Sequence, residues 1–200
     1  MTGSDSKHQM RQAALARRDA LPAQTRQQAA AAIAERLFAL PAWQAAGVVA
    51  VYAAFRSEVA TGDIIARALA AGKRVAAPAT RWGERALEFR VISRAADLVP
   101  GRLGIPEPGP ECPALRLAEA DLVLVPGAAF DRRGYRLGYG AGLYDRALAG
   151  APALLAVGLA FAAQVVARVP AGASDRPVDL LVTERETIDC GAVRRQTGGG

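Results

Sequence analysis

A glycine-rich segment at residues 136–145 carries the strongest chemical signal in the chain. It reads Arg-Leu-Gly-Tyr-Gly-Ala-Gly-Leu-Tyr-Asp, so glycine occupies every second position from Gly138 to Gly142. Such a stretch lets a phosphate chain approach several backbone N–H groups closely. Arg136 offers a planar set of donors to phosphate oxygens, and Asp145 can hold a metal ion beside them. The segment therefore predicts a phosphate-binding loop.

The spacing of these glycines matches neither of the two common nucleotide-binding motifs. No Gly-Lys-Ser/Thr follows, as a Walker loop requires, and the third glycine comes one position too early for a Rossmann fingerprint. A helix is expected to begin at residue 143, and its free N–H groups favour an anion. Spacing alone leaves a second interpretation open, in which the glycines only let this helix pack closely.

Residues for the commonest hydrolytic mechanisms are absent from the sequence. The single histidine, His8, lies in the polar N-terminal segment. A Ser-His-Asp triad, a Cys-His pair or a two-histidine metal site in the core is therefore not expected. Cys112 and Cys190 are too few for a structural zinc site, and a disulfide between them is not expected in a reducing compartment.

The composition favours a soluble cytoplasmic protein. Hydrophobic residues make up 52% of the 200 residues, but no apolar run reaches the ~18–20 residues that span a bilayer, and the polar start lacks a signal sequence. The net charge is +6, yet the basic residues are scattered, so neither nucleic acid nor a membrane is an expected partner. A basic balance also suits an anionic small substrate. We expect a monomer, although the sequence leaves an oligomer open.

The elements that must position the glycine-rich segment alternate between helices and apolar strands. Helices are expected over residues 7–20 and 25–40, the second capped by Thr25 and ended by Pro41. Strands are expected over residues 47–55, 74–79, 86–92, 121–126, 153–161 and 178–184. Further helices are expected over residues 62–71, capped by Thr61 and stopped at Gly72, over 143–149 and near 162–168.

This alternation predicts an α/β fold with a mostly parallel sheet covered by helices, because the strands are apolar on both faces. We expect one domain over residues 7–190, with disordered tails at 1–6 and 191–200. Residues 97–117 are rich in proline and glycine. They are expected to form a long irregular loop, and loops of that length are commonly functional.

Six motifs follow one another along residues 7–187. The longest, Pro-Gly-x-x-Phe-Asp-x-x-Gly-x-Arg-Leu-Gly-x-Gly-x-Gly, occupies residues 126–142. The others are Lys7-x-x-x-Arg11, Glu58-x-x-Thr61, Gly104-Ile-x-Glu107-Pro, Ala160-Phe-x-x-Gln164 and the late Asp175. With these motifs the chain resembles the 5-formyltetrahydrofolate cyclo-ligase (methenyltetrahydrofolate synthetase) family. The resemblance implies a three-layer α/β/α fold that is NagB/RpiA/CoA transferase-like.

The resemblance also implies a reaction, which converts 5-formyltetrahydrofolate and ATP, with Mg²⁺, to 5,10-methenyltetrahydrofolate, ADP and phosphate. It implies catalytic roles for Arg136 and Asp145, and Mg²⁺ binding by Asp145 and Asp175. The implied ATP-binding residues are Lys7, Arg11, Arg136, Leu137, Gly138, Tyr139, Gly140, Ala141, Gly142, Leu143 and Tyr144. The implied folate-binding residues are Ala53, Glu58, Tyr139, Gly140, Ala141, Gly142, Leu143 and Tyr144.

On residue type alone, several of these positions also have ordinary structural interpretations. Lys7 and Arg11 are one helical turn apart and would be two solvated charges. Glu58 would be an acidic residue before a helix, Asp145 a charge that stabilises a helix start, and Asp175 a turn residue.

The chain departs from the family pattern at three positions. Leu143 stands where many relatives have tyrosine, Ala141 where some have lysine, and Ser174 where bacterial relatives often have histidine. These departures leave open a second hypothesis, a relative that binds nucleotide or folate without turnover. A third, a phosphate-sugar isomerase on a similar sheet, would leave the glycines and Asp175 unexplained.

Overall fold

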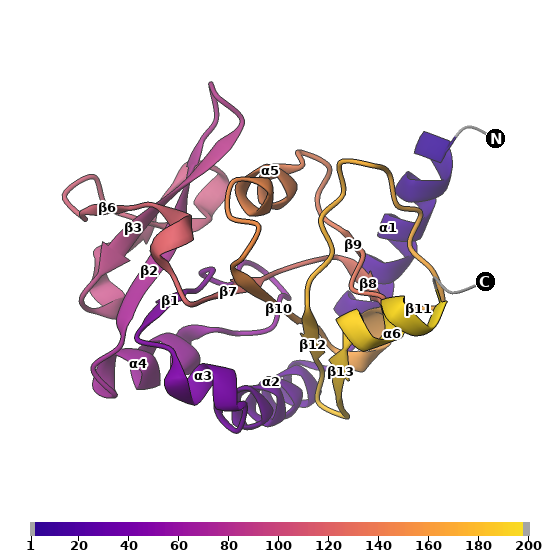
Figure 1. The fold of residues 1–200 in the computed structure, drawn as a ribbon, viewed down its shortest axis with the longest axis horizontal. Helices are drawn as coiled ribbons and strands as arrows, with labels where there is room; N and C mark the ends of the chain where they lie inside the picture. The colour runs from indigo at the N-terminus through magenta and orange to yellow at the C-terminus, as the bar shows by residue number, and fades with distance from the viewer. Residues whose placement is uncertain (1–2, 198–200) are drawn as a thin grey trace.

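An eight-stranded sheet runs through the centre of the molecule, in the strand order β13-β12-β10-β7-β1-β2-β3-β6 (Figure 1). The computed structural model describes residues 3–197. The five central strands pair in parallel, and β13, β3 and β6 add antiparallel edges. The strands of this sheet are β1 (Val48–Ala50), β2 (Arg74–Arg81), β3 (Ala86–Ile92), β6 (Ala114–Leu115), β7 (Leu122–Val125), β10 (Leu155–Leu159), β12 (Leu180–Val182) and β13 (Thr187–Asp189).

Helices cover both faces of this sheet, so the predicted mostly parallel three-layer α/β/α fold is confirmed. Figure 1 shows α2 (Ala23–Phe38), α3 (Pro41–Ala45) and α4 (Gly62–Ala70) below the sheet, and α5 (Leu143–Ala149) above it. Alternate residues of each strand supply the two cores. Val49 and Val75 pack with the lower helices, whereas Ala50 and Ala76 share the other core with α5 and α6 (Cys190–Thr197).

A second, three-stranded sheet lies against the N-terminal helix. It contains β8 (Ala129–Asp131), β9 (Arg136–Leu137) and β11 (Val165–Val166), with β8 in the middle. The helix α1 (Gly3–Asp19) packs on β8 and on the short 3₁₀ turn η4 (Ala162–Gln164). Its buried Ala14 clusters with Ala129 and Leu137. This sheet therefore carries Arg136, and α1 is held beside it.

Several predicted boundaries are confirmed, and others are wrong. The expected strand at 86–92 and helix at 143–149 coincide with β3 and α5, and Gly72 follows α4 with a φ of +74°. Thr25 lies inside α2, because the carbonyl of Pro22 accepts the first helical bond. Pro41 ends no helix but begins α3, a position that proline favours.

The strand expected over residues 47–55 is also too long, since β1 ends at Ala50. Thr61 explains the difference. Its hydroxyl donates to the carbonyl of Tyr52 and accepts from the amide of Ala54 at 3.1 Å, so these backbone groups do not need a neighbouring strand. Thr61 therefore fixes this loop and makes no side-chain cap on α4.

Three further segments differ from expectation. Residues 97–117 contain a hairpin of β4 (Leu98–Pro100) and β5 (Pro106–Pro108) rather than an irregular loop. The helix expected near 162–168 is only the short η4, followed by β11. Helices α1 and α6 occupy residues 3–6 and 191–197 of the expected tails, and the remaining tail residues lie outside the described part. Cys112 and Cys190 are free, as expected.

Gln164 ties together two loops that follow parallel strands. Its buried side chain donates to the carbonyls of Gly127 at 2.8 Å and Ala128 at 3.0 Å, and accepts from the amide of Phe161 at 3.0 Å. Buried backbone groups require such partners. The Ala-Phe-x-x-Gln motif therefore has a structural role.

Replacing Gln164 tests this role. Gln164→Ala should lower the free energy of unfolding by about 1–3 kcal/mol, because buried carbonyls lose their donor. Gln28→Ala, at an exposed position of α2, is the control and should change it by less than about 0.5 kcal/mol. Urea denaturation measures both. Equal effects of the two substitutions would contradict the assignment.

Candidate active site

A cavity of about 310 Å³ opens where β1 and β7 end. Tyr52 and Ala53 follow β1, and Pro126 and Gly127 follow β7, so both strands deliver their next residues to its wall. In the sheet, β1 lies between β7 and β2. The chain passes from β1 to β2, on the side away from β7. Ligands of open α/β sheets bind at this kind of crevice, outside the carboxyl ends of the strands.

Every site residue predicted from the sequence lines this cavity. They are Lys7, Arg11, Ala53, Glu58, Arg136, Leu137, Gly138, Tyr139, Gly140, Ala141, Gly142, Leu143, Tyr144, Asp145 and Asp175. The fold thus brings together α1, the loop after β1, the glycine-rich segment and the 172–175 turn, which are far apart in sequence.

Sequence analysis assigned no role to the rest of the wall, which is formed by Tyr52, Phe55, Pro78, Thr80, Leu87, Ile105, Pro106, Glu107, Pro126 and Gly127. Two sequence features could have pointed to part of this wall, namely the end of the expected strand at 74–79 and the Gly-Ile-x-Glu-Pro motif. Thr80 lies at the carboxyl end of β2, which runs parallel to β1, and Leu87 pairs with it across the hairpin. Glu107 accepts from the amide of Thr80 at 3.1 Å, so the Gly-Ile-x-Glu-Pro motif fastens the β4–β5 hairpin to the cavity wall.

The glycine-rich loop turns sharply before α5. Gly140 has a φ of +107° and Gly142 a φ of +64°, a conformation that other residues adopt only with strain. Gly142 is the N-cap of α5 and supplies no side chain, so the first amides of this helix lack partners within it. The loop therefore presents accessible backbone donors to the cavity.

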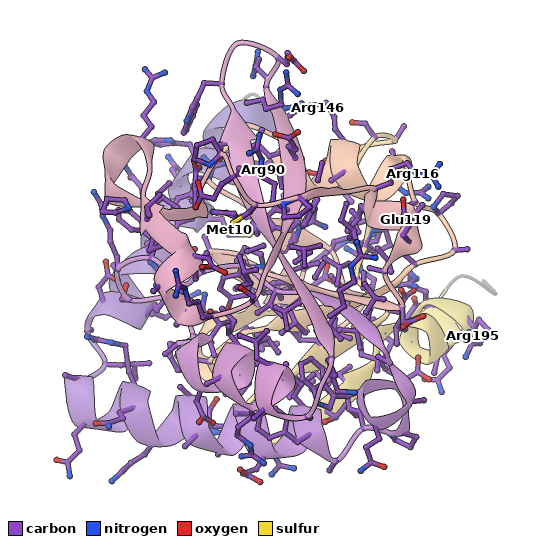
Figure 2. All side chains as sticks on the ribbon, turned by 90° about the vertical axis from the view of Figure 1, so that its left-hand side faces the viewer. Met10, Arg90, Arg116, Glu119, Arg146 and Arg195 are labelled. Atoms are coloured by element: carbon purple, nitrogen blue, oxygen red, sulfur yellow. The ribbon has the colours of Figure 1, made fainter. Side chains whose placement is uncertain are left out.

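Two arginines fasten this loop by its carbonyl groups. Arg11 of α1 donates to the carbonyl of Gly138 at 2.6 Å. Arg146 of α5 lies beside the hairpin between β2 and β3 (Figure 2), where it donates to the carbonyl of Arg85 at 2.9 Å and to that of Ala141 at 2.7 Å. Each guanidinium leaves the loop amides free.

The charged centre of the cavity is the pair of Arg136 and Asp145, whose nitrogen and oxygen lie 2.9 Å apart. The side chain of Arg136 is only 3% exposed and also donates to the carbonyl of Arg176. The amide of Arg176 returns a bond to the same Asp145 oxygen at 3.1 Å. Burial lowers the pKa of the Arg136 guanidinium, and the negative charge of Asp145 opposes that effect.

A second ion pair closes the cavity from the side of α1. Lys7 Nζ lies 2.8 Å from Asp175 Oδ2, which also accepts from the amide of Gly172 at 2.8 Å. Burial alone would raise the pKa of Asp175, but the bonds from Lys7 and Gly172 outweigh it and lower the pKa. Lys7 is therefore not the solvated charge that its residue type alone suggested.

Glu58 and tyrosines line another part of the cavity. One Glu58 oxygen accepts from the amide of Phe55 at 2.9 Å, and the other accepts from the hydroxyl of Tyr139 at 3.2 Å. Burial raises the pKa of Glu58, and both bonds oppose that rise. The hydroxyl of Tyr144 is buried and has no hydrogen-bond partner among the described residues, so it is free to contact a ligand.

Asp145 and Asp175 suit a Mg²⁺ ion that is shared with a ligand. Each accepts its hydrogen bonds from the described residues through one oxygen only, Oδ1 of Asp145 and Oδ2 of Asp175. Mg²⁺ is usually held by one or two carboxylates together with water and substrate phosphates. Within residues 3–197 no group of three or more His, Cys, Asp or Glu side chains is placed for a metal. The residues therefore fit a cation that arrives with a phosphate.

Asp131 and Gly134, from the same long motif, have a structural role. Asp131 is fully buried, and it accepts from the side chain of Arg133 at 2.7 Å and from the amide of Val169 at 2.9 Å. Gly134 has a φ of +87°, and a Cβ there would lie 2.3 Å from the carbonyl of Val178. These contacts hold the turn between β8 and β9, and so the position of Arg136.

The fold and the cavity are those of an α/β protein that binds an anionic small molecule at the carboxyl edge of its sheet. A model of the 5-formyltetrahydrofolate cyclo-ligase family matches residues 3–184. The chain belongs to the 5-formyltetrahydrofolate cyclo-ligase family, which confirms the resemblance inferred from the motifs and argues against the phosphate-sugar isomerase.

Individual relatives agree with this assignment. The chain is 34% identical to 5-formyltetrahydrofolate cyclo-ligase of Escherichia coli over 171 residues, which are 84% of this chain and 94% of the relative. The solved 5,10-methenyltetrahydrofolate synthetase of Aquifex aeolicus is 33% identical with a TM-score of 0.82, and the match covers 92% of each chain. A synthetase from Mycoplasma pneumoniae has the same fold, with 23% identity, a TM-score of 0.73, and coverage of 89% of this chain and 98% of that chain.

Two glycines of the loop give a matched test of its backbone geometry. Gly140→Ala should lower the free energy of unfolding by about 1–2 kcal/mol, because its φ of +107° strains any side chain. Gly138→Ala should leave it unchanged, because no neighbouring heavy atom lies within 4 Å of an added Cβ. Urea denaturation of both variants measures the difference. Equal stability would mean that the loop does not hold this conformation in solution.

Proposed function

We propose that this chain converts 5-formyltetrahydrofolate and ATP, with Mg²⁺, to 5,10-methenyltetrahydrofolate, ADP and phosphate. The observation that carries the proposal is that the groups proposed to bind phosphate and those proposed to bind the pterin line the same cavity. Its lining includes Lys7, Arg11 and Arg136 together with the carboxylates of Asp145 and Asp175. Membership of the family supports the same reaction.

The chemical difficulty of this reaction is a poor leaving group. The formyl carbonyl belongs to an amide, and N10 of the folate cannot readily expel its oxygen. The formyl oxygen therefore attacks the γ-phosphorus of ATP, and ADP departs. N10 then attacks the formyl carbon, the carbon–oxygen bond breaks, phosphate leaves and N10 loses its proton. The protein must mainly position phosphates and neutralise their charge, so the lack of a histidine in the core is no handicap.

The cations of the cavity are arranged for this task. Without ligand, Lys7 pairs with Asp175 and Arg136 pairs with Asp145. A triphosphate on the loop amides offers these cations further charged acceptors, and Arg11 is already bonded to the loop at Gly138. We expect Lys7 to exchange its carboxylate for phosphate oxygens. Asp145 and Asp175 would hold Mg²⁺, which would supply further neutralisation of the phosphate charge.

The folate fits the end of the cavity near Glu58. An ionised carboxylate accepts the adjacent N–H donors of an amino-pyrimidinone edge, and Glu58 is already oriented by Phe55 and Tyr139. Ala53 leaves room for the ring, and the free hydroxyl of Tyr144 offers a donor beside it. Glu58 is bonded to Tyr139 of the glycine-rich loop, so a pterin held at Glu58 would lie beside this loop.

We also propose that the chain works as a single domain over residues 7–190, as a cytoplasmic monomer. No helix in the described part of the chain has the length and hydropathy to cross a membrane. Size-exclusion chromatography with light scattering would distinguish the monomer from an oligomer.

The reaction can be followed optically, because methenyltetrahydrofolate absorbs in the near ultraviolet. Purified protein should produce this absorbance from 5-formyltetrahydrofolate only when ATP and Mg²⁺ are both present. Binding of folate or ATP without product would instead favour the non-catalytic relative, to which Ala141 and Leu143 point.

The role of the Asp145 charge can be tested with a substitution that keeps the size of the side chain. Asp145→Asn keeps a hydrogen-bond acceptor for Arg136 but removes the charge, so kcat/KM should fall about 100-fold and the Mg²⁺ requirement should rise about tenfold. Asp63→Asn, on the exposed face of α4, is the matched control and should match the unmodified chain. A Mg²⁺ requirement unaltered in Asp145→Asn would refute its assigned role.

A further inference from the structure

Arg18 is a buried arginine to which the proposed reaction assigns no task. It lies near the end of α1 with its side chain only 2% exposed. Its Nε donates to the hydroxyl of Ser57 at 3.0 Å, and its two terminal nitrogens lie 3.3 and 3.4 Å from the hydroxyl of Tyr139. Ser57 precedes Glu58 in sequence, and the hydroxyl of Tyr139 lies 3.2 Å from a Glu58 oxygen.

We infer that Arg18 is a positioning residue, which directs the hydroxyl of Tyr139 to donate to Glu58 and so prepares that carboxylate to bind the pterin. The inference rests on the proposed function. It adds a residue outside the cavity wall, on a different element from Glu58 and Tyr139, that controls how tightly folate is bound.

The direction of these bonds follows from the chemistry of the guanidinium. An arginine side chain has only donors, whereas a hydroxyl donates once and accepts twice. When Arg18 donates to Tyr139, the proton of that hydroxyl must point elsewhere, and Glu58 lies 3.2 Å from it. Reversing the bond would set two donors against each other. Arg18 therefore selects the single arrangement in which Tyr139 donates to the carboxylate.

A second chain of bonds begins at the same guanidinium. Ser57 accepts from Arg18 and donates in turn to Asp19, whose oxygen also lies 3.5 Å from Arg18. The bond from Ser57 is the main reason that the pKa of Asp19 is lowered. Together the two chains fasten the 55–58 turn and the glycine-rich loop to α1.

Arg18 occupies a position where an apolar residue would serve packing alone. It lies one helical turn after Ala14, which is completely buried, so both face the interior. Burying a guanidinium costs free energy, and its closest bonded partners here are two neutral hydroxyls. A purely structural role does not require that charge, whereas orientation of Tyr139 and Glu58 does.

The charge also acts on Glu58 directly. The titratable groups that face this carboxylate are Arg18 from α1, Tyr52 after β1, Tyr139 from the glycine-rich loop and Tyr144 from α5. Of these four only Arg18 is a cation, and it opposes the rise in the pKa of Glu58 that burial causes. Without Arg18 that pKa should rise further. Glu58 would then be protonated at a higher pH and lose its ability to accept two donors.

The test compares kcat and the KM values for folate and ATP over neutral and mildly acidic pH. Arg18→Leu should raise the KM for 5-formyltetrahydrofolate about tenfold, change the KM for ATP less than about twofold, and move the loss of folate binding at low pH to higher pH. Arg18→Lys keeps the positive charge but lacks the planar guanidinium. It should restore the pH profile, whereas the KM for 5-formyltetrahydrofolate should return only part of the way to that of the unmodified chain. The control is Arg17→Leu, because Arg17 is the exposed neighbour of Arg18 and is bonded to the carbonyl of Ala163. This substitution should change neither the KM values nor the pH profile.

Tyr139→Phe removes the hydroxyl that donates to Glu58 and leaves Arg18 in place, so it tests the inference even if Arg18→Leu does not fold. It should raise the folate KM by a similar factor. An unchanged folate KM and pH profile in Arg18→Leu would overturn the inference, as would an unchanged folate KM in Tyr139→Phe. Folate binding followed by quenching of protein fluorescence separates the two claims. An unmodified chain that binds folate without turnover contradicts the proposed function, while the binding constants of the variants still test Arg18.

Discussion

The buried ion pair between Arg136 and Asp145 is the interaction on which the site depends. The Arg136 guanidinium is 3% exposed, and a close counter-charge and a bonded carbonyl offset the cost of burying it. Asp145 supplies that charge from α5, and Arg176 supplies its carbonyl from the turn before β12. The pair thus joins β9, α5 and the 172–177 segment around one charge. Breaking it would leave a buried charge unpaired and detach the glycine-rich loop from the turn that carries Asp175.

The parallel sheet gives this pair its surroundings. Because β1 and β7 are neighbours and run in the same direction, the loops that follow them meet at one edge. Gln164 and Asp131 then hold the backbone of the adjoining turns, and Arg11 and Arg146 hold the glycine-rich loop by its carbonyls. Arg11 and Arg146 bond to carbonyls of the glycine-rich loop, so the amides of this loop are left for a ligand. The sequence motifs of the chain therefore divide into residues that line the cavity and residues that support its walls.

Much of the fold was predictable because local patterns and tertiary structure agree. The run at 121–126 is apolar on both faces and forms the central β7, and the alternation at 86–92 forms β3. Prediction failed where a side chain replaced a backbone partner. Thr61 takes over the bonds of Tyr52 and Ala54, so β1 ends early although its sequence remains apolar.

The site was predictable from motifs, but its supporting contacts were not. Lys7, Glu58 and Asp175 line one cavity although spacing alone could not relate them. Arg18 gave no signal, because α1 has arginines at several positions and only packing reveals which one is buried. Scattered charges such as Arg90, Arg116 and Arg195 lie well apart in Figure 2 and look the same in sequence.

A structure with Mg²⁺ and a non-hydrolysable ATP analogue tests the account most directly. The account predicts a triphosphate against the amides of residues 138–142, with Lys7 moved from Asp175 onto a phosphate oxygen and Arg136 still held at the same edge of the sheet. An analogue bound elsewhere, or a bound analogue with the Lys7–Asp175 pair unchanged at 2.8 Å, would contradict it.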